Sequence, residues 1–217
     1  MAKQDFDEQS IKNISQPGGD PFSPHVSATL LLEEKADKLH ERLRQCKKTI
    51  DWADYENICA DILEFSLADC LSDTQPRKQQ STWDNTQRMD IIMYNNPSRA
   101  TGFWHEIRYG GESDTSLLIF ECKNYEKGIT PKEVMQAHSY EIRGGRHFRC
   151  ILTREEPSEP AYNAIRHWWH YYQVLIIVLT DVEMHELIDA RLKGPEEVDR
   201  IFHATYQGEK RAKWYQL

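Results

Sequence analysis

Apolar residues along the chain recur with two spacings, one typical of helices and one typical of short buried strands. The first spacing alternates steps of four and three residues, at Leu32, Ala36, Leu39, Leu43, Cys46 and Ile50. It predicts a helix over about residues 27–48 with one apolar stripe. The stripe fits either packing against the rest of the chain or a short self-associating zipper. A second apolar face predicts another helix over about 51–71.

Short apolar runs farther along the chain predict strands at 87–94, 117–125, 148–152 and 174–180. Periodic segments between and after them predict helices at about 130–145, 160–172, 181–193 and from 196 onward. Thr130, Pro131 and Glu133 form a strong helix start, with a cap, a first-turn proline and a capping-box glutamate. Residues 72–80 are rich in turn formers, and residues 101–116 predict an irregular or hairpin insertion.

Helices alternate with strands after an initial hairpin, and this order predicts an α/β fold. We expect a mixed β-sheet flanked by helices, with an N-terminal helical extension. The predicted divisions are a flexible arm at 1–25, an N-terminal helix at 26–50, a main domain at 51–194 and a C-terminal helical tail at 195–217.

Composition narrows the class of protein. With 217 residues, 39% of them hydrophobic and 29% charged, the chain can bury a core without disulfides. The longest apolar run, Val174–Leu179, is too short to span a bilayer, so we expect no membrane contact. The five cysteines form no Cys-x-x-Cys pair, which argues against a zinc ribbon and predicts free core residues in a reducing, cytoplasmic setting: Cys46, Cys59, Cys70, Cys122 and Cys150.

The net charge of −8 is unfavourable for binding a polyanion, but the basic residues are unevenly distributed. The segment from 143 to 154 contains no acidic residue and four arginines: Arg143, Arg146, Arg149 and Arg154. We predict that these arginines contact nucleic-acid phosphates. The alternative is a solvated strand edge.

The chemistry is concentrated at the end of the apolar run from Leu117. Here Glu121 and Lys123 follow four apolar residues, and residues two apart on a strand face the same side of a sheet. Asp90 lies near the start of the preceding predicted strand. Charges so close to buried strands are costly unless they pair or bind a metal ion.

The pattern Met89-Asp90 followed by Glu121-Cys122-Lys123 resembles the core motif of the PD-(D/E)XK, or restriction-endonuclease-like, nucleases. Met89 stands where that motif usually has proline. Two further matches involve Glu56, on the helix before the first strand, and Gln136 with Tyr140, four apart on the helix after the Glu-x-Lys strand. The resemblance covers about residues 51–180.

The resemblance implies a Mg²⁺ or Mn²⁺ site formed by Asp90, Glu121 and the backbone carbonyl of Cys122, with Glu56 holding a water or a second ion. Lys123 would orient the attacking water, and Gln136 and Tyr140 would contact the phosphate or that water.

The implied function is metal-dependent hydrolysis of DNA phosphodiesters that leaves 5′-phosphate ends. The implied setting is bacterial restriction, antiviral defence or DNA repair. A homodimer or larger complex would allow both strands of a duplex to be cut. Two alternatives stay open: an RNA-directed nuclease, and a catalytically inactive binding or assembly module of the same fold.

Overall fold

The computed structural model describes residues 24–81, 88–110, 115–138, 148–172 and 174–207, and it is built around one five-stranded sheet. The strands lie side by side in chain order: β1 (Arg77–Ser81), β2 (Arg88–Tyr94), β3 (Leu117–Lys123), β4 (Phe148–Thr153) and β5 (Leu175–Thr180). The first three strands pair antiparallel and the last three pair parallel. This change of direction at β3 makes the sheet mixed.

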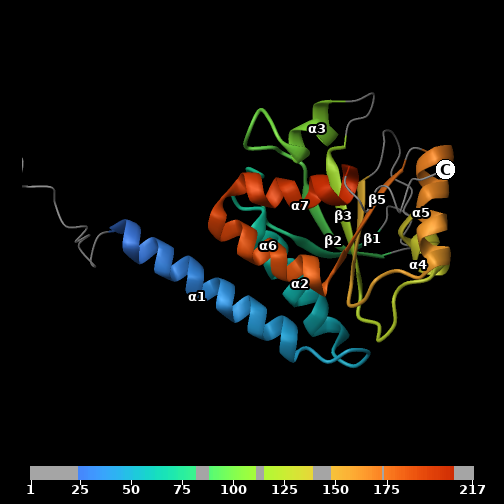
Figure 1. Cartoon of the computed structure of the whole chain (residues 1–217), viewed down its shortest axis with the longest axis horizontal. Coiled ribbons are helices and arrows are strands. Elements are labelled where there is room, and N and C mark those ends of the chain that lie inside the picture. The colour runs from blue at the N-terminus through green and yellow to red at the C-terminus, as the bar shows by residue number, and fades with distance from the viewer. Residues whose placement is uncertain (1–23, 82–87, 111–114, 139–147, 173, 208–217) are drawn as a thin grey trace, which may run out of the picture.

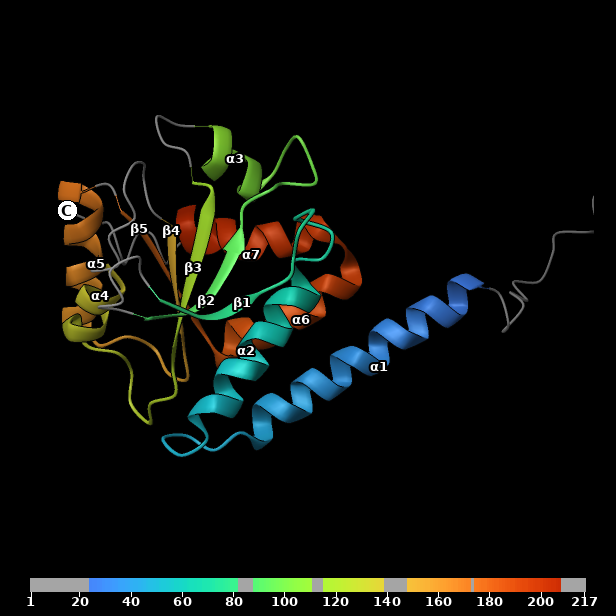
Figure 2. The ribbon, with the colours of Figure 1, turned by 180° about the vertical axis from the view of Figure 1, so that it is seen from behind.

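Helices cover both faces of the sheet (Figure 1). They are α1 (Pro24–Gln45), α2 (Trp52–Ser66), α3 (Phe103–Tyr109), α4 (Pro131–His138), α5 (Glu159–Tyr172), α6 (Asp181–Lys193) and α7 (Pro195–Gln207). Both views show α4 and α5 on one side of the sheet and α2, α6 and α7 on the other (Figures 1 and 2). The α/β class, the mixed sheet flanked by helices and the N-terminal helical extension are confirmed.

The alternation of side chains along β3 divides its residues between two cores. Leu118, Phe120 and Cys122 lie in the core beneath α2, α6 and α7. The intervening residues, among them Glu121 and Lys123, face the opposite side, where α4 packs. β3 therefore presents its charged pair toward α4, at the carboxyl end of the strand.

The apolar stripe of α1 is buried within the chain. Leu39 and Leu43 belong to the core shared with α2 and α6, whereas Ile50 lies beyond the helix and is exposed. The stripe is thus explained by intramolecular packing, the first of its two interpretations. The N-terminal half of α1 extends away from the sheet (Figures 1 and 2). The stripe of α1 therefore no longer supports the predicted homodimer, and the oligomeric state stays a prediction.

Two elements differ from the predictions. Residues 77–81 form β1 although every side chain in it is exposed, so no alternating apolar pattern marked it. The segment expected to be an irregular or hairpin insertion contains α3, whose Phe103 and Trp104 are buried against Phe202 of α7. Both views show α3 near the amino-terminal end of β3 (Figures 1 and 2).

Two local predictions, the start of α4 and the free cysteines, are confirmed. Thr130 donates its backbone N–H to Glu133 at 2.8 Å, as expected for the start of α4. All five cysteines are buried and free. The predicted C-terminal tail begins as α7, which buries Val198, Ile201 and Phe202 and is part of the core. Within the described ranges, no helix has the length and apolar character needed to cross a membrane.

Candidate active site

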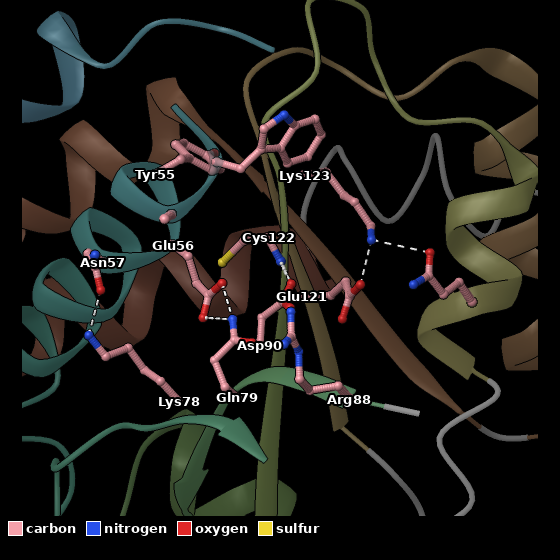
Figure 3. Close-up of a pocket in the computed structure, with 13 residues that line it drawn as sticks. Tyr55, Glu56, Asn57, Lys78, Gln79, Arg88, Asp90, Glu121, Cys122 and Lys123 are labelled. Atoms are coloured by element: carbon pink, nitrogen blue, oxygen red, sulfur yellow. Dashed lines mark hydrogen bonds and ion pairs between the residues drawn. The ribbon is translucent and has the colours of Figure 1, made fainter. Parts of the chain in front are cut away.

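A cavity of about 850 Å³ opens where the carboxyl end of β3 meets α2, β1 and α4. Its lining contains six residues singled out in the sequence: Glu56, Asp90, Glu121, Cys122, Lys123 and Gln136. They come from four elements and span eighty positions of the chain, so the fold brings them together (Figure 3). The remaining lining includes Lys78 and Arg88, which add positive charge.

Glu121 and Lys123 form a buried ion pair, as their two-residue spacing on a strand predicts. Lys123 Nζ lies 2.5 Å from Glu121 Oε1, and the two residues are only 6% and 3% exposed. Lys123 also donates to Gln136 Oε1 on α4 at 3.3 Å. Burial alone would lower the pKa of Lys123, but the adjacent Glu121 carboxylate outweighs it and leaves that pKa raised. The amine is therefore held as a cation.

Asp90 is fixed against the same strand through its side chain. The backbone N–H of Cys122 donates to Asp90 Oδ2 at 2.8 Å. Burial raises the pKa of the Asp90 carboxyl, and the Cys122 N–H, Lys123 and Arg88 counteract only part of that effect. Asp90 is thus bound to the backbone of the middle residue of the Glu-x-Lys motif, and its negative charge is incompletely compensated.

Glu56 is a third carboxylate that lines the cavity. It extends from α2 into the cavity and accepts hydrogen bonds from the side-chain amide of Gln79 (Figure 3). Burial raises the pKa of Glu56, and the negative charge of Asp90 raises it further, against the effects of Gln79, Arg88 and Lys78. The mutual repulsion of Glu56 and Asp90 would be relieved by a cation between them.

The contribution of β1 to this cavity was missed in the sequence. Residues on either side of Gln79 pair with β2, but Gln79 itself has φ of 57°, in the left-handed region that non-glycine residues seldom occupy. Such conformations cluster at functional sites. The neighbouring Lys78 donates to Asn57 Oδ1 at 2.6 Å, which ties β1 to α2. In the sequence, the one feature that could have indicated this contribution of β1 is the basic pair Arg77-Lys78 in a polar stretch.

The predicted arginine contacts to nucleic acid need correction. Arg149 is 2% exposed and donates to the carbonyl oxygens of Ala137 and Phe148. Arg154 is 7% exposed and donates to the carbonyl of Cys46 at 3.0 Å. Neither guanidinium can reach a phosphate outside the protein, because both are enclosed in the fold. The other two arginines of the set, Arg143 and Arg146, lie outside the described residues. The predicted site residue Tyr140 also lies outside them.

Arg154 instead belongs to a buried group behind the cavity wall. Its Nε lies 2.9 Å from Asp181 Oδ2, and its guanidinium lies 4.9 Å from the ring centroid of Tyr55. Tyr55, which lines the cavity, donates its hydroxyl to Asp181 Oδ1 at 3.4 Å. Burial raises the pKa of Asp181 to about 6 despite the opposing charge of Arg154. These contacts hold α2, and with it Glu56, against the ends of β4 and β5.

The residues present fit a divalent cation of the Mg²⁺ type. Among the described residues, no three His, Cys, Asp or Glu side chains are arranged to hold one metal ion. Mg²⁺, however, is commonly bound by one or two carboxylates and keeps several waters. Asp90 and Glu121 supply two carboxylates in a cavity with room for water. Hard oxygen donors of this kind favour Mg²⁺ or Mn²⁺ over Zn²⁺.

Comparison with known proteins gives one structural similarity. No family model matches the sequence, and no curated protein matches it. Among solved structures, the chain is similar to restriction endonuclease FokI, with 14% sequence identity and a TM-score of 0.39. The match covers 83% of this chain and 32% of that enzyme, so the chain spans about a third of the length of the protein it matches.

Proposed function

We propose that the chain is a metal-dependent nuclease that hydrolyses phosphodiester bonds of DNA in the cavity formed by α2, β1, β2, β3 and α4. The observation that carries the proposal is the convergence of Asp90, Glu121 and Lys123 in one cavity from two strands. These residues match the motif by which the sequence resembles PD-(D/E)XK nucleases. A buried carboxylate and amine beside a second, half-buried carboxylate are costly to maintain without a function.

Each residue has a part that follows from its chemistry. Asp90 and Glu121 would hold the cation together with the backbone carbonyl of Cys122. When bound there, Mg²⁺ would supply Lewis-acid activation of the scissile phosphate and of a water molecule. Lys123 orients the attacking water and stabilises negative charge that develops on the phosphate oxygens.

Lys123 is suited to this part because its position is fixed. Glu121 and Gln136 each accept a hydrogen bond from its Nζ, so the amine does not have to reorganise during the reaction. Hydrolysis forms a bond from the water oxygen to phosphorus and breaks a bond from phosphorus to the leaving oxygen. The resemblance implies that the phosphate stays on the 5′ end of one product.

Positive charge at the cavity supports binding of a polyanion by this acidic chain. Lys78 and Arg88 line the cavity and are exposed, whereas Arg149 and Arg154 are enclosed. We therefore assign phosphate contact to Lys78 and Arg88. The role in restriction, antiviral defence or repair, and any assembly into a dimer or larger complex, belong to the proposal by resemblance alone.

The test is a cleavage assay with purified full-length protein on plasmid, linear duplex, single-stranded DNA and RNA. Each substrate is incubated with Mg²⁺, Mn²⁺ or EDTA. We expect cleavage of DNA with either cation and none with EDTA. Cleavage of RNA alone would support the RNA-directed alternative. No cleavage of any substrate, together with retained binding, would support the inactive binding module.

A further inference from the structure

One large aromatic side chain at the cavity is exposed. Trp52, the first residue of α2, lines the cavity that contains Asp90, Glu121 and Lys123, yet it is 43% exposed. Single exposed apolar residues are common on protein surfaces. Trp52 differs from such residues because it borders a cavity with catalytic chemistry and because its ring is fixed in place.

Trp52 is held by contacts that leave one part of the indole open. Its Nε1–H donates to the carbonyl oxygen of Thr49 at 2.9 Å, so the indole has no further donor to offer. The ring also meets Tyr125 edge-on, with centroids 5.2 Å apart. What remains exposed is therefore apolar aromatic surface.

The loop that holds Trp52 is tied to the strand that carries the reactive lysine. Thr49, with φ of 63°, donates its backbone N–H to the carbonyl of Asn124 at 2.9 Å. The buried side chain of Asn124 donates in return to the carbonyl of Lys47 at 3.0 Å. Asn124 directly follows Lys123, so the position of the indole is coupled to that of the amine through two hydrogen bonds and one peptide unit.

We propose that the exposed indole of Trp52 is a stacking surface for an unpaired nucleobase, and that the substrate is single-stranded nucleic acid or an unpaired stretch beside a duplex. This inference rests on the proposed nuclease function of the same cavity. A base inside a duplex has both faces covered by its neighbours and cannot stack on a side chain. A cavity of about 850 Å³ is in the size range of small-molecule sites, so an unpaired base can enter it and a whole duplex cannot.

Binding, measured separately from cleavage, tests this proposal. Full-length protein in EDTA is titrated into labelled 12-nucleotide single-stranded DNA, the same strand in a blunt duplex, and a 12-unit abasic strand, with fluorescence anisotropy as the readout. One stacked base contributes roughly 1–3 kcal/mol, so the base-containing strand should bind roughly 5- to 150-fold more tightly than the abasic strand. We expect W52A to lose most of this preference for the base-containing strand.

Two variants and one control separate stacking from packing. W52F keeps an aromatic face and should keep most of the ratio, whereas W52L keeps apolar area without a π-system and should behave like W52A. Tyr171, which is 74% exposed on α5 and away from the cavity lining, gives the matched control Y171A, expected to bind like wild type.

The outcomes distinguish this inference from the nuclease proposal. If wild type and W52A prefer the base-containing strand over the abasic strand by the same factor, the stacking role is overturned even if cleavage with Mg²⁺ is observed. A ratio that depends on Trp52, in a protein that cuts nothing with any cation, would uphold the stacking surface and overturn the nuclease. Tighter binding of the blunt duplex than of the single strand would also overturn the inference.

Discussion

The backbone N–H of Cys122 donates a 2.8 Å hydrogen bond to Oδ2 of Asp90. This bond joins β2 to the middle residue of the Glu-x-Lys motif on β3. It holds the Asp90 carboxylate against the backbone of β3, beside the ion pair of Glu121 and Lys123, without using either of those side chains (Figure 3). Asp90, 32 positions away from Cys122 in the chain, is thereby held at the carboxyl end of β3.

Two substitutions of Asp90 distinguish the role of its charge from the role of its hydrogen bond to Cys122. In D90N, the amide oxygen can still accept from Cys122, so stability should be close to wild type while Mn²⁺ binding and cleavage are lost. In D90A, the buried Cys122 N–H loses its partner, which costs roughly 1–3 kcal/mol in the free energy of unfolding. Urea denaturation beside isothermal Mn²⁺ titration checks both. Metal binding by D90N equal to wild type would remove Asp90 from the ligand set.

Lys123 should be needed for rate and not for metal binding. K123M keeps the length of the side chain, and the amine is no metal ligand, so Mn²⁺ should still bind. Cleavage should fall roughly 10²- to 10³-fold, as when one preorganised charge is removed.

Without metal, K123M removes the buried cation that pairs with Glu121, and breaking a buried ion pair in this way costs roughly 3–5 kcal/mol. Saturating Mn²⁺ should therefore raise the thermal midpoint of K123M more than that of wild type. An equal rise in both proteins would show that the cation does not meet Glu121.

The basic residues at the cavity should bind nucleic acid, in contrast to the enclosed arginines. R88A and K78A remove exposed charges that line the cavity, so they should weaken binding of all sequences and reduce the dependence of affinity on salt. Both side chains are exposed, so their removal should lower stability by less than the removal of the buried Arg149 side chain. R149A, which removes two buried hydrogen bonds, should instead lose stability and leave the affinity of the folded fraction unchanged. Anisotropy titrations over a range of salt concentrations separate the two classes.

Asp181 should make stability depend on pH. Its pKa is raised from 3.8 to about 6 in the folded chain, because burial disfavours the charged form. Folding therefore favours the protonated carboxyl, and that contribution is present below pH 4 and lost as pH rises through 6. Relative to D181N, wild type should lose about 3 kcal/mol over this interval.

The slope is the readout for Asp181, because D181N also removes the ion pair with Arg154. The exposed carboxyl of Asp37 on α1 is the matched site for a control variant, D37N. Parallel curves for D181N and wild type between pH 4 and pH 7 would contradict the prediction.

Much of the fold followed from the sequence because buried strands leave a clear pattern. The run from Leu117 predicted β3, and its two-residue period correctly placed Glu121 and Lys123 on one face. β1 could not be predicted in this way, since all five of its side chains are exposed and its place is set by pairing with β2. Gln79 was missed with it.

For Arg149 and Arg154, the predicted contact with nucleic acid was wrong for a physical reason. The absence of acidic residues between 143 and 154 describes charge along the chain and not exposure. Arg149 lies on β4, a central parallel strand in which all six residues are buried because helices cover both faces. Sequence spacing alone does not show which faces are covered. The stripe of α1 illustrates the same limit, since its spacing fits an intramolecular contact and a zipper equally well.

Cleavage by E121Q tests the account most directly. The substitution keeps the size of the side chain and its ability to accept a hydrogen bond from Lys123, but it removes the charge that a cation requires. The exposed carboxyl of Glu126, five residues later, gives the matched control E126Q. With Mg²⁺ and the substrate that wild type cuts best, we predict cleavage by wild type and E126Q and none by E121Q. Cleavage by E121Q at the wild-type rate would contradict the assignment of this cavity as the active site.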